Sequence, residues 1–166
     1  MSYPKLVPAF TARVPIDPPA AVGSSKGGLN HVPILAGGSF VSEPGYPIQV
    51  DAEFVHGADY IRPDVDGARL RLNVNAILKQ KGSADAFFNY SYTGIIEINS
   101  EIGKVLTGAP DAATTSQGNA FTHVSFETGN AGLKELENRL YVSAGRFIVE
   151  KGSPVIVEYK ISEVTV

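Results

Sequence analysis

Apolar and polar residues alternate along extended segments of this chain. The alternation is clearest between residues 69 and 79, where apolar residues hold the even positions and polar or basic residues hold most odd positions. A period of two places the two kinds of side chain on opposite faces, which is typical of a strand with one buried side. The pattern therefore predicts an all-β protein.

Similar segments recur along most of the chain and are separated by stretches rich in Gly and Pro. The predicted strands cover residues 10–14, 31–35 continuing at 39–41, 48–55, 60–62, 68–79, 86–99, 121–128, 140–149 and 155–166. Turn sequences such as Asp66-Gly67 favour hairpins, and hairpins give antiparallel pairing. About eight to ten such strands predict one antiparallel sheet closed into a barrel with a lumen.

The segments between the predicted strands contain one or two short helices and two long loops. Residues 100–106 predict a short helix with Ser100 as its N-cap, and residues 132–138 predict one helical turn with Leu133 and Leu136 inward. Pro15 to Gly28 predicts a loop, and Gly37-Gly38 predicts a bulge or a barrel corner. Residues 107–119 predict a long, mobile connection, and such loops often act as lids or binding loops.

Length and composition limit the function classes. A chain of 166 residues favours a single domain over residues 1–166, and its net charge of -3 disfavours nucleic acid as a partner. No apolar stretch approaches the roughly 20 residues needed to span a bilayer, and no secretory signal pattern opens the chain, so a cytoplasmic location is expected. The absence of cysteine excludes disulfides and thiolate catalysis.

A set of short motifs in a fixed order resembles the family known as domain of unknown function 3237. The motifs are Gly37-Gly38-Ser39-Phe40, His56-Gly57-Ala58-Asp59-Tyr60, Arg62-Pro63-Asp64 with Asp66-Gly67, Phe126-Glu127-Thr128-Gly129, and Tyr141-Val142 before Gly145-Arg146. The resemblance runs from about Leu6 to the C-terminus. It implies a lipocalin-like antiparallel barrel with a central pocket, often a dimer, with some fungal relatives in natural-product pathways.

The chain departs from the pattern of that family at two places. Asn73 and Asn75 stand where the family tends to carry an acid and an arginine, and Glu135-Leu136-Glu137 stands where it tends to have Trp-Leu-Asn. Both departures favour a pocket for a different, less polar ligand.

Familiar catalytic motifs are missing from the chain. There is no nucleophile elbow and no phosphate-binding loop, and the three histidines have no metal-ligand spacing, so no cofactor and no metal are expected. Asp59 and Tyr60, with His56 nearby, could point an acid and a phenol at a ligand. The alternative is a turn in which Asp59 caps backbone N–H groups.

Aromatic and amide side chains supply further candidates. Phe88, Tyr90 and Tyr92 share one face of a predicted strand, which is either ordinary core or a ligand platform. Asn73 and Asn75 share a face that is either solvated or lines the lumen. His123 either lies exposed or donates to a ligand, and Phe126 is expected to be a pocket wall.

These residues predict a cofactor-independent enzyme for an apolar, oxygenated small molecule. The reaction would be a cyclisation or isomerisation, such as a pericyclic hetero-Diels–Alder addition, in which the pocket holds a near-attack geometry and donates hydrogen bonds. The candidate catalytic residues are His56, Asp59, Tyr90 and His123, and the candidate substrate-binding residues are Tyr60, Asn73, Asn75, Phe88, Tyr92 and Phe126.

Two alternatives stay open from the sequence. One is a carrier that binds an apolar metabolite without turnover, because carrier and cyclase pockets share the same apolar walls. The other is a dehydratase or hydrolase that uses Asp59 and His56 as an acid–base pair. A homodimer is a further expectation, with strand edges such as residues 155–166 meeting across a two-fold axis.

Overall fold

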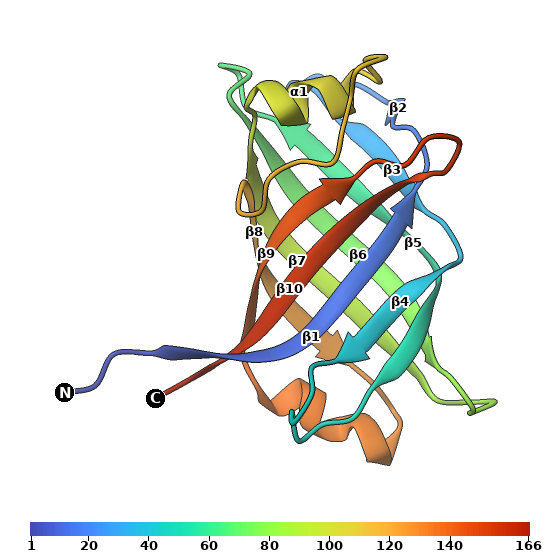
Figure 1. Cartoon of the computed structure of the whole chain (residues 1–166), viewed down its shortest axis with the longest axis vertical. Coiled ribbons are helices and arrows are strands. Elements are labelled where there is room, and N and C mark those ends of the chain that lie inside the picture. The colour runs from blue at the N-terminus through green and yellow to red at the C-terminus, as the bar shows by residue number, and fades with distance from the viewer.

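The order of the strands around the molecule follows their order in the chain. A computed structural model describes residues 1–166 and is drawn in Figure 1. The strands are β1 (Lys5–Ile16), β2 (Ala20–Ala21), β3 (Asn30–Ile34), β4 (Gly37–Ser42), β5 (Asp51–Pro63), β6 (Arg69–Gln80), β7 (Phe87–Glu97), β8 (Ala120–Glu127), β9 (Tyr141–Ile148) and β10 (Val155–Thr165). An α-helix, α1 (Ser100–Leu106), and a 3₁₀ helix, η1 (Ala131–Asn138), complete the list.

The sheet closes on itself, because the first long strand pairs with the last. β1 and β10 are antiparallel from Lys5 opposite Thr165 to Ile16 opposite Val155. The ring then runs from β10 through β9, β8, β7 and β6 to β5, and β3 and β4 fill the place between β5 and β1. The predicted closed antiparallel β-barrel is therefore confirmed. The expected free edge at residues 155–166 is wrong, since β10 has a neighbour on each side.

The glycine pair between β3 and β4 interrupts one wall of the barrel. Gly37 and Gly38 both have positive φ angles, and a Cβ atom on Gly38 would clash with the carbonyl oxygen of Arg13. The pairing of β4 with β5 shifts register between Gly37 and Phe40. The predicted bulge is confirmed, and it lets two short strands share one position in the ring.

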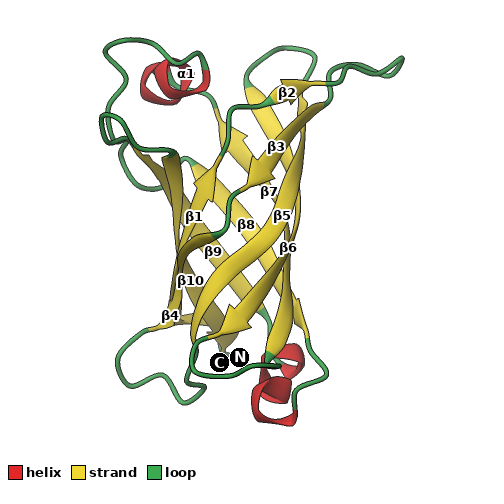
Figure 2. Ribbon diagram, turned by 90° about the vertical axis from the view of Figure 1, so that its right-hand side faces the viewer, coloured by secondary structure: helices red, strands yellow, loops and turns green.

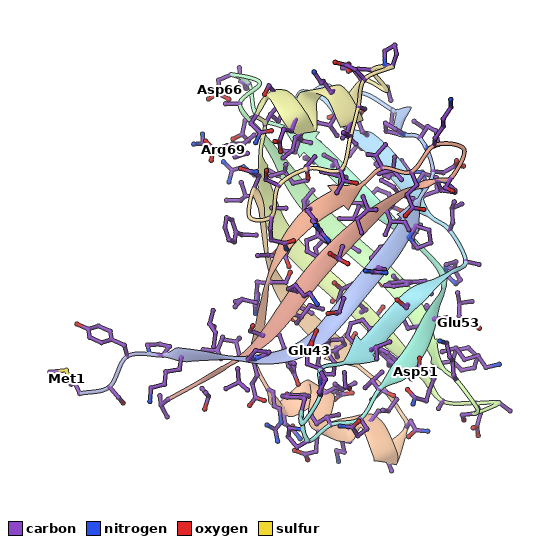
Figure 3. The ribbon with its side chains drawn as sticks, in the orientation of Figure 1. Met1, Glu43, Asp51, Glu53, Asp66 and Arg69 are labelled. Atoms are coloured by element: carbon purple, nitrogen blue, oxygen red, sulfur yellow. The ribbon has the colours of Figure 1, made fainter.

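Side chains alternate between the interior and the outer surface along each long strand. On β6, the residues from Leu70 to Leu78 at even positions are buried, whereas Asn73 and Asn75 are exposed. Figure 3 shows Asp51 and Glu53 of β5 pointing away from the barrel, and Ala52 and Phe54 on the same strand are buried. The period of two in the sequence thus corresponds to the inner and outer faces of the wall.

The two helices lie at opposite ends of the barrel (Figure 2). In α1 the capping residue is Asn99, whose side chain accepts a hydrogen bond from the Ile102 N–H at 2.9 Å, so the prediction of Ser100 as the N-cap was one residue late. In η1, Leu133 and Leu136 are buried, as predicted. Neither helix has the length and apolar character needed to cross a membrane.

A two-stranded ribbon extends beyond the barrel at the chain termini (Figure 1). Its strands are the start of β1, Lys5 to Pro8, and the end of β10, Ser162 to Thr165. The register of β1 and β10 shifts between Pro8 and Phe10, where the ribbon leaves the wall. Leu6 on this ribbon is 60% exposed, so the ribbon carries apolar surface into solvent.

Candidate functional site: a cavity at the α1 end of the barrel

An internal cavity of about 570 Å³ occupies the α1 end of the barrel. Its walls are mainly aliphatic side chains that point inward from the strands: Val14, Ile16, Val32, Ile34, Ile61, Leu70, Ile96, Val155 and Val157, with Phe147. Apolar walls with a few polar groups are typical of sites for small molecules. The prediction of a lumen is therefore matched by a measurable hollow inside the barrel.

The mouth of the cavity is formed by three segments at the α1 end. They are residues 17–19 after β1, residues 105–108 at the end of α1, and residues 153–155 in the β9–β10 turn. Asp17, Thr107 and Ser153 are exposed, so the cavity reaches the surface there and its rim is polar.

Asp59 is the one carboxylic acid that lines the inner part of the cavity. It projects from β5, is 8% exposed, and accepts a hydrogen bond from the backbone N–H of Asn73 at 3.0 Å. Burial raises the pKa of Asp59 to about 6, and the Asn73 hydrogen bond opposes that shift only in part. No basic side chain pairs with it. Near neutral pH this carboxylate is a stronger base than an exposed aspartate.

Two phenols line the cavity together with Asp59. Tyr92 comes from β7 and Tyr159 from β10, and their ring centroids are 5.2 Å apart. Burial holds the pKa of each hydroxyl above its ordinary range. Both hydroxyls are therefore neutral hydrogen-bond donors at ordinary pH.

The register of the sheet explains why Asp59 and Tyr92 face the same space. Asp59 is opposite Val74 on β6, and Val74 is opposite Tyr92 on β7. The three residues form one row across the wall, and all three are buried. Neighbouring strands lie about 4.8 Å apart, so a tyrosine side chain can lean over the intervening valine toward the carboxylate.

Three predicted residues lie deeper, in an aromatic core toward η1. Phe88, Tyr90 and Phe126 are buried, and Phe126 lies 6.1 Å from Phe88 and 5.7 Å from Tyr90 between ring centroids. They do not line the cavity. The Tyr90 hydroxyl is fully buried and has no hydrogen-bond partner. Tyr90 packs against Tyr92, at 5.4 Å between centroids, and so supports the inner end of the cavity.

The remaining predicted site residues point outward. Their side chains are exposed on the outer face of the wall: His56, Tyr60, Asn73, Asn75 and His123. The expected Asp59–His56 pair is therefore not assembled, because one side chain lies inside the barrel and the other outside. The two residues are three positions apart on β5, and both follow the register shift between Phe54 and His56, so simple alternation places them on opposite faces.

The outward residues are not brought together into one cluster. Tyr60 packs against the ring of His31 at 5.2 Å between centroids. His123 lines a groove of about 800 Å³ on the outer wall, together with Phe121, Ile95 and Leu6. No group of three or more His, Asp or Glu side chains is close enough to hold a metal ion.

Sequence reasoning missed Tyr159 and the aliphatic wall of the cavity. Tyr159 has the same parity as Val155, Val157 and Ile161 on β10, so the alternation contained the signal that it points inward. Alternation along one strand does not show which other strands lie close to it across the interior of the barrel. Only the closed structure shows that β10 places a phenol beside Tyr92.

The predicted mobile connection, residues 107–119, is held in place over part of its length. Thr107 and Gly108 lie at the mouth. Further along, Thr115 is buried, donates its N–H to the Phe147 carbonyl at 2.9 Å and accepts from the Phe147 N–H at 3.0 Å. The Gly118 N–H bonds to the Gly145 carbonyl at 3.2 Å. Residues 115–118 are thus fastened to β9, and only the part near the mouth is free of it.

The fold and cavity define a class of protein: a closed antiparallel β-barrel with an internal cavity near one end. The sequence also matches a family model described as "protein of unknown function (DUF3237)" over residues 4–164, so the chain belongs to the DUF3237 family. The resemblance inferred from the sequence motifs is thereby confirmed. None of the curated proteins compared with the chain matches it.

Solved structures share the fold at low sequence identity. A conserved protein of unknown function from Rhodopseudomonas palustris gives a TM-score of 0.74 at 17% identity over 99% of both chains. A β-barrel-like protein from Acinetobacter baumannii gives 0.71 at 17% identity over 99% of this chain and 98% of that one. A protein of unknown function from Clostridium acetobutylicum gives 0.69 at 18% identity over 98% and 99%.

Proposed function

We propose that the protein is a cofactor-independent enzyme that binds an apolar, oxygenated small molecule in the cavity and controls its cyclisation or isomerisation. The observation that carries the proposal is the placement of Asp59 inside a mainly apolar cavity, with no basic partner. Burying such a group costs free energy. A site of this kind can hold a substrate oxygen or handle a proton while the apolar walls fix the geometry of the rest of the molecule.

The narrowest form of the proposal is a pericyclic step such as a hetero-Diels–Alder addition. That reaction needs a folded substrate conformation and a hydrogen bond to a carbonyl that gains charge. The aliphatic walls supply the first requirement, and the hydroxyls of Tyr92 and Tyr159 supply the second. A natural-product intermediate is the proposed substrate type.

The second candidate is a carrier that binds an apolar metabolite without turnover, which the aliphatic walls favour on their own. Citronellal, an apolar aldehyde whose cyclisation gives isopulegol diastereomers, separates the two. The test follows the rate and the diastereomer ratio by chiral chromatography with wild type and with Val157→Phe, which places a larger side chain inside the cavity. A faster reaction with an altered ratio, lost in Val157→Phe, supports the enzyme. Saturable binding with an unchanged ratio leaves only the carrier.

The protein is also proposed to act as a homodimer. The supporting feature is the outer groove, whose lining includes Phe121 (59% exposed), Ile95 (40%) and Leu6 of the terminal ribbon (60%). Apolar surface of this kind often marks an interface. Light scattering on wild type and on Phe121→Glu tests it: a wild-type dimer that becomes a monomer in the variant is expected, and a monomeric wild type contradicts it.

A further inference from the structure

The cavity contains more polar chemistry than the retention of an apolar ligand requires. Aliphatic walls alone would bind such a ligand, and an unpaired carboxylate in that setting opposes both folding and binding. Tyr92 and Tyr159 add two hydroxyls that also need partners when they are buried. The combination of one carboxylate and two phenols around one space therefore calls for a chemical explanation.

The geometry gives each of these groups a free position toward the cavity. One oxygen of Asp59, Oδ1, accepts the Asn73 N–H at 3.0 Å, and the other, Oδ2, takes part in no hydrogen bond. Because β5 and β6 fix the backbone on both sides of that bond, the carboxylate is held in one orientation. Tyr92 lies in the same cross-strand row, and Tyr159 reaches the site from β10.

We propose that Asp59 is a general base that moves a proton between two carbons of an enolisable ketone, while Tyr92 and Tyr159 hold the ketone oxygen. This inference rests on the proposed function and names its substrate class: an apolar ketone of one or two rings with an acidic C–H beside the carbonyl. A cavity of about 570 Å³ is large enough for such a molecule.

The step balances without an oxidant, a metal or a cofactor. The Asp59 carboxylate takes a proton from the carbon next to the carbonyl, and the electron pair of that C–H bond becomes a new C=C bond. The carbonyl π pair moves to oxygen, where the Tyr92 and Tyr159 hydroxyls donate hydrogen bonds to the enolate. Asp59 then returns the proton to the same carbon or to the far carbon of a conjugated system, so the net reaction is exchange or isomerisation.

The test uses 2-tetralone, a bicyclic ketone with acidic C–H bonds, in D₂O. Proton NMR follows the replacement of its α-hydrogens by deuterium, with the full-length protein. Wild type is expected to speed the exchange above the buffer rate. Asp59→Asn keeps an oxygen for the Asn73 N–H but removes the base, so exchange should fall by about 100-fold or more. Tyr92→Phe and Tyr159→Phe should each lower it by about 10-fold or more.

Matched controls separate these effects from general damage. Asp85→Asn and Tyr3→Phe make the same chemical changes at exposed positions and should leave the exchange rate unchanged. Asp59→Glu retains a carboxylate on a longer side chain and should recover part of the rate lost in Asp59→Asn. The near-UV circular dichroism of each variant reports whether its aromatic core is intact.

Binding of 2-methylnaphthalene, which has no oxygen and no acidic proton, distinguishes failure of the general-base inference from failure of the proposed function. If it binds in the cavity but wild type does not speed the exchange of 2-tetralone, the general-base inference is overturned and the proposed function stands. Exchange that persists at the wild-type rate in a folded Asp59→Asn also overturns the inference. If neither bicyclic compound binds, the proposed function itself fails, and the inference fails with it.

Discussion

At the η1 end of the barrel the interior is filled by aromatic rings, whereas at the α1 end aliphatic side chains surround a cavity of about 570 Å³. The filled end is dense: Phe10 lies 4.9 Å from Phe40, and Phe126 lies 5.2 Å from Tyr141, between ring centroids. The same strands supply both ends. β1, for example, contributes Phe10 to the filled end and Val14 and Ile16 to the cavity.

The comparison shows that the volume of inward side chains, and not the strand pattern, decides where the barrel is hollow. An eight-stranded barrel has an interior just wide enough for side chains to fill. Large rings meet across it at one end. Branched aliphatic side chains at the other end are too short to meet, and the space between them remains.

Removal of one aromatic ring at the filled end should have the largest effect on stability. Phe126→Ala is expected to cost about 3–5 kcal/mol, because the ring is buried among Phe10, Phe40, Tyr90 and Tyr141. Ile61→Ala, at the cavity wall, should cost about 2 kcal/mol, because Ile61 already borders empty space. Urea unfolding measures both, and equal losses would contradict the comparison.

Removal of the buried charge should stabilise the cavity end. The pKa of Asp59 is raised from 3.8 to about 6 in the folded protein, because burial favours the neutral acid. The folded protein therefore keeps its full stability below about pH 3.8 and loses stability as the pH rises through 6 and the buried side chain becomes charged. Asp59→Asn should therefore raise the free energy of unfolding by about 3 kcal/mol above about pH 7, and by little near pH 4. A variant less stable than wild type at both pH values would refute this.

Adding volume should be tolerated at one end and not at the other. Val157→Phe extends into the cavity and is expected to cost less than about 1.5 kcal/mol while it lowers the affinity for 2-methylnaphthalene. Ala12→Phe adds more volume at a fully buried position that does not line the cavity, and should cost about 3 kcal/mol. Thermal unfolding and a binding titration compare the two variants, and an unchanged affinity in Val157→Phe would mean that the ligand binds elsewhere.

The smallest expected effect concerns the connection between α1 and β8. Glu101 accepts hydrogen bonds from the backbone N–H of Ser116 at 2.8 Å and from its hydroxyl at 3.3 Å, both at the surface. Glu101→Gln should lower stability by about 0.5 kcal/mol or less. Limited proteolysis should then cleave residues 107–119 faster than in wild type. Unchanged cleavage would show that the bonds of Thr115 and Gly118 to β9 hold the loop by themselves.

Much of the fold could be predicted from the sequence, because alternation and turn residues are local signals. The strand of residues 68–79 and the break at Gly37-Gly38 are visible in the chain itself and are confirmed. The predicted N-cap of α1, Ser100, is one residue after the observed one, because Asn99 and Ser100 are both good capping residues.

The site was harder to predict, because alternation does not show which strands face one another across the closed barrel. His56 and Asp59 are three positions apart and both follow the register shift, so alternation itself places them on opposite faces. Asn73 and Asn75 lie at the odd positions of β6, which face outward. The alternative that their amides line the lumen is therefore wrong. Tyr159 was absent from the candidates, since its contact with Tyr92 joins strands far apart in the chain.

The central claim is that the α1 end binds an apolar molecule with its oxygen toward Tyr92 and Tyr159 and the adjacent carbon toward Asp59. It is tested most directly by a crystal structure of the protein with 2-naphthol, a planar mimic of an enol. The rings are expected between Leu70 and Val157, with the hydroxyl within hydrogen-bond distance of Tyr92 or Tyr159. Naphthol bound only in the outer groove beside Phe121, with the cavity closed by the protein's own side chains, would contradict it.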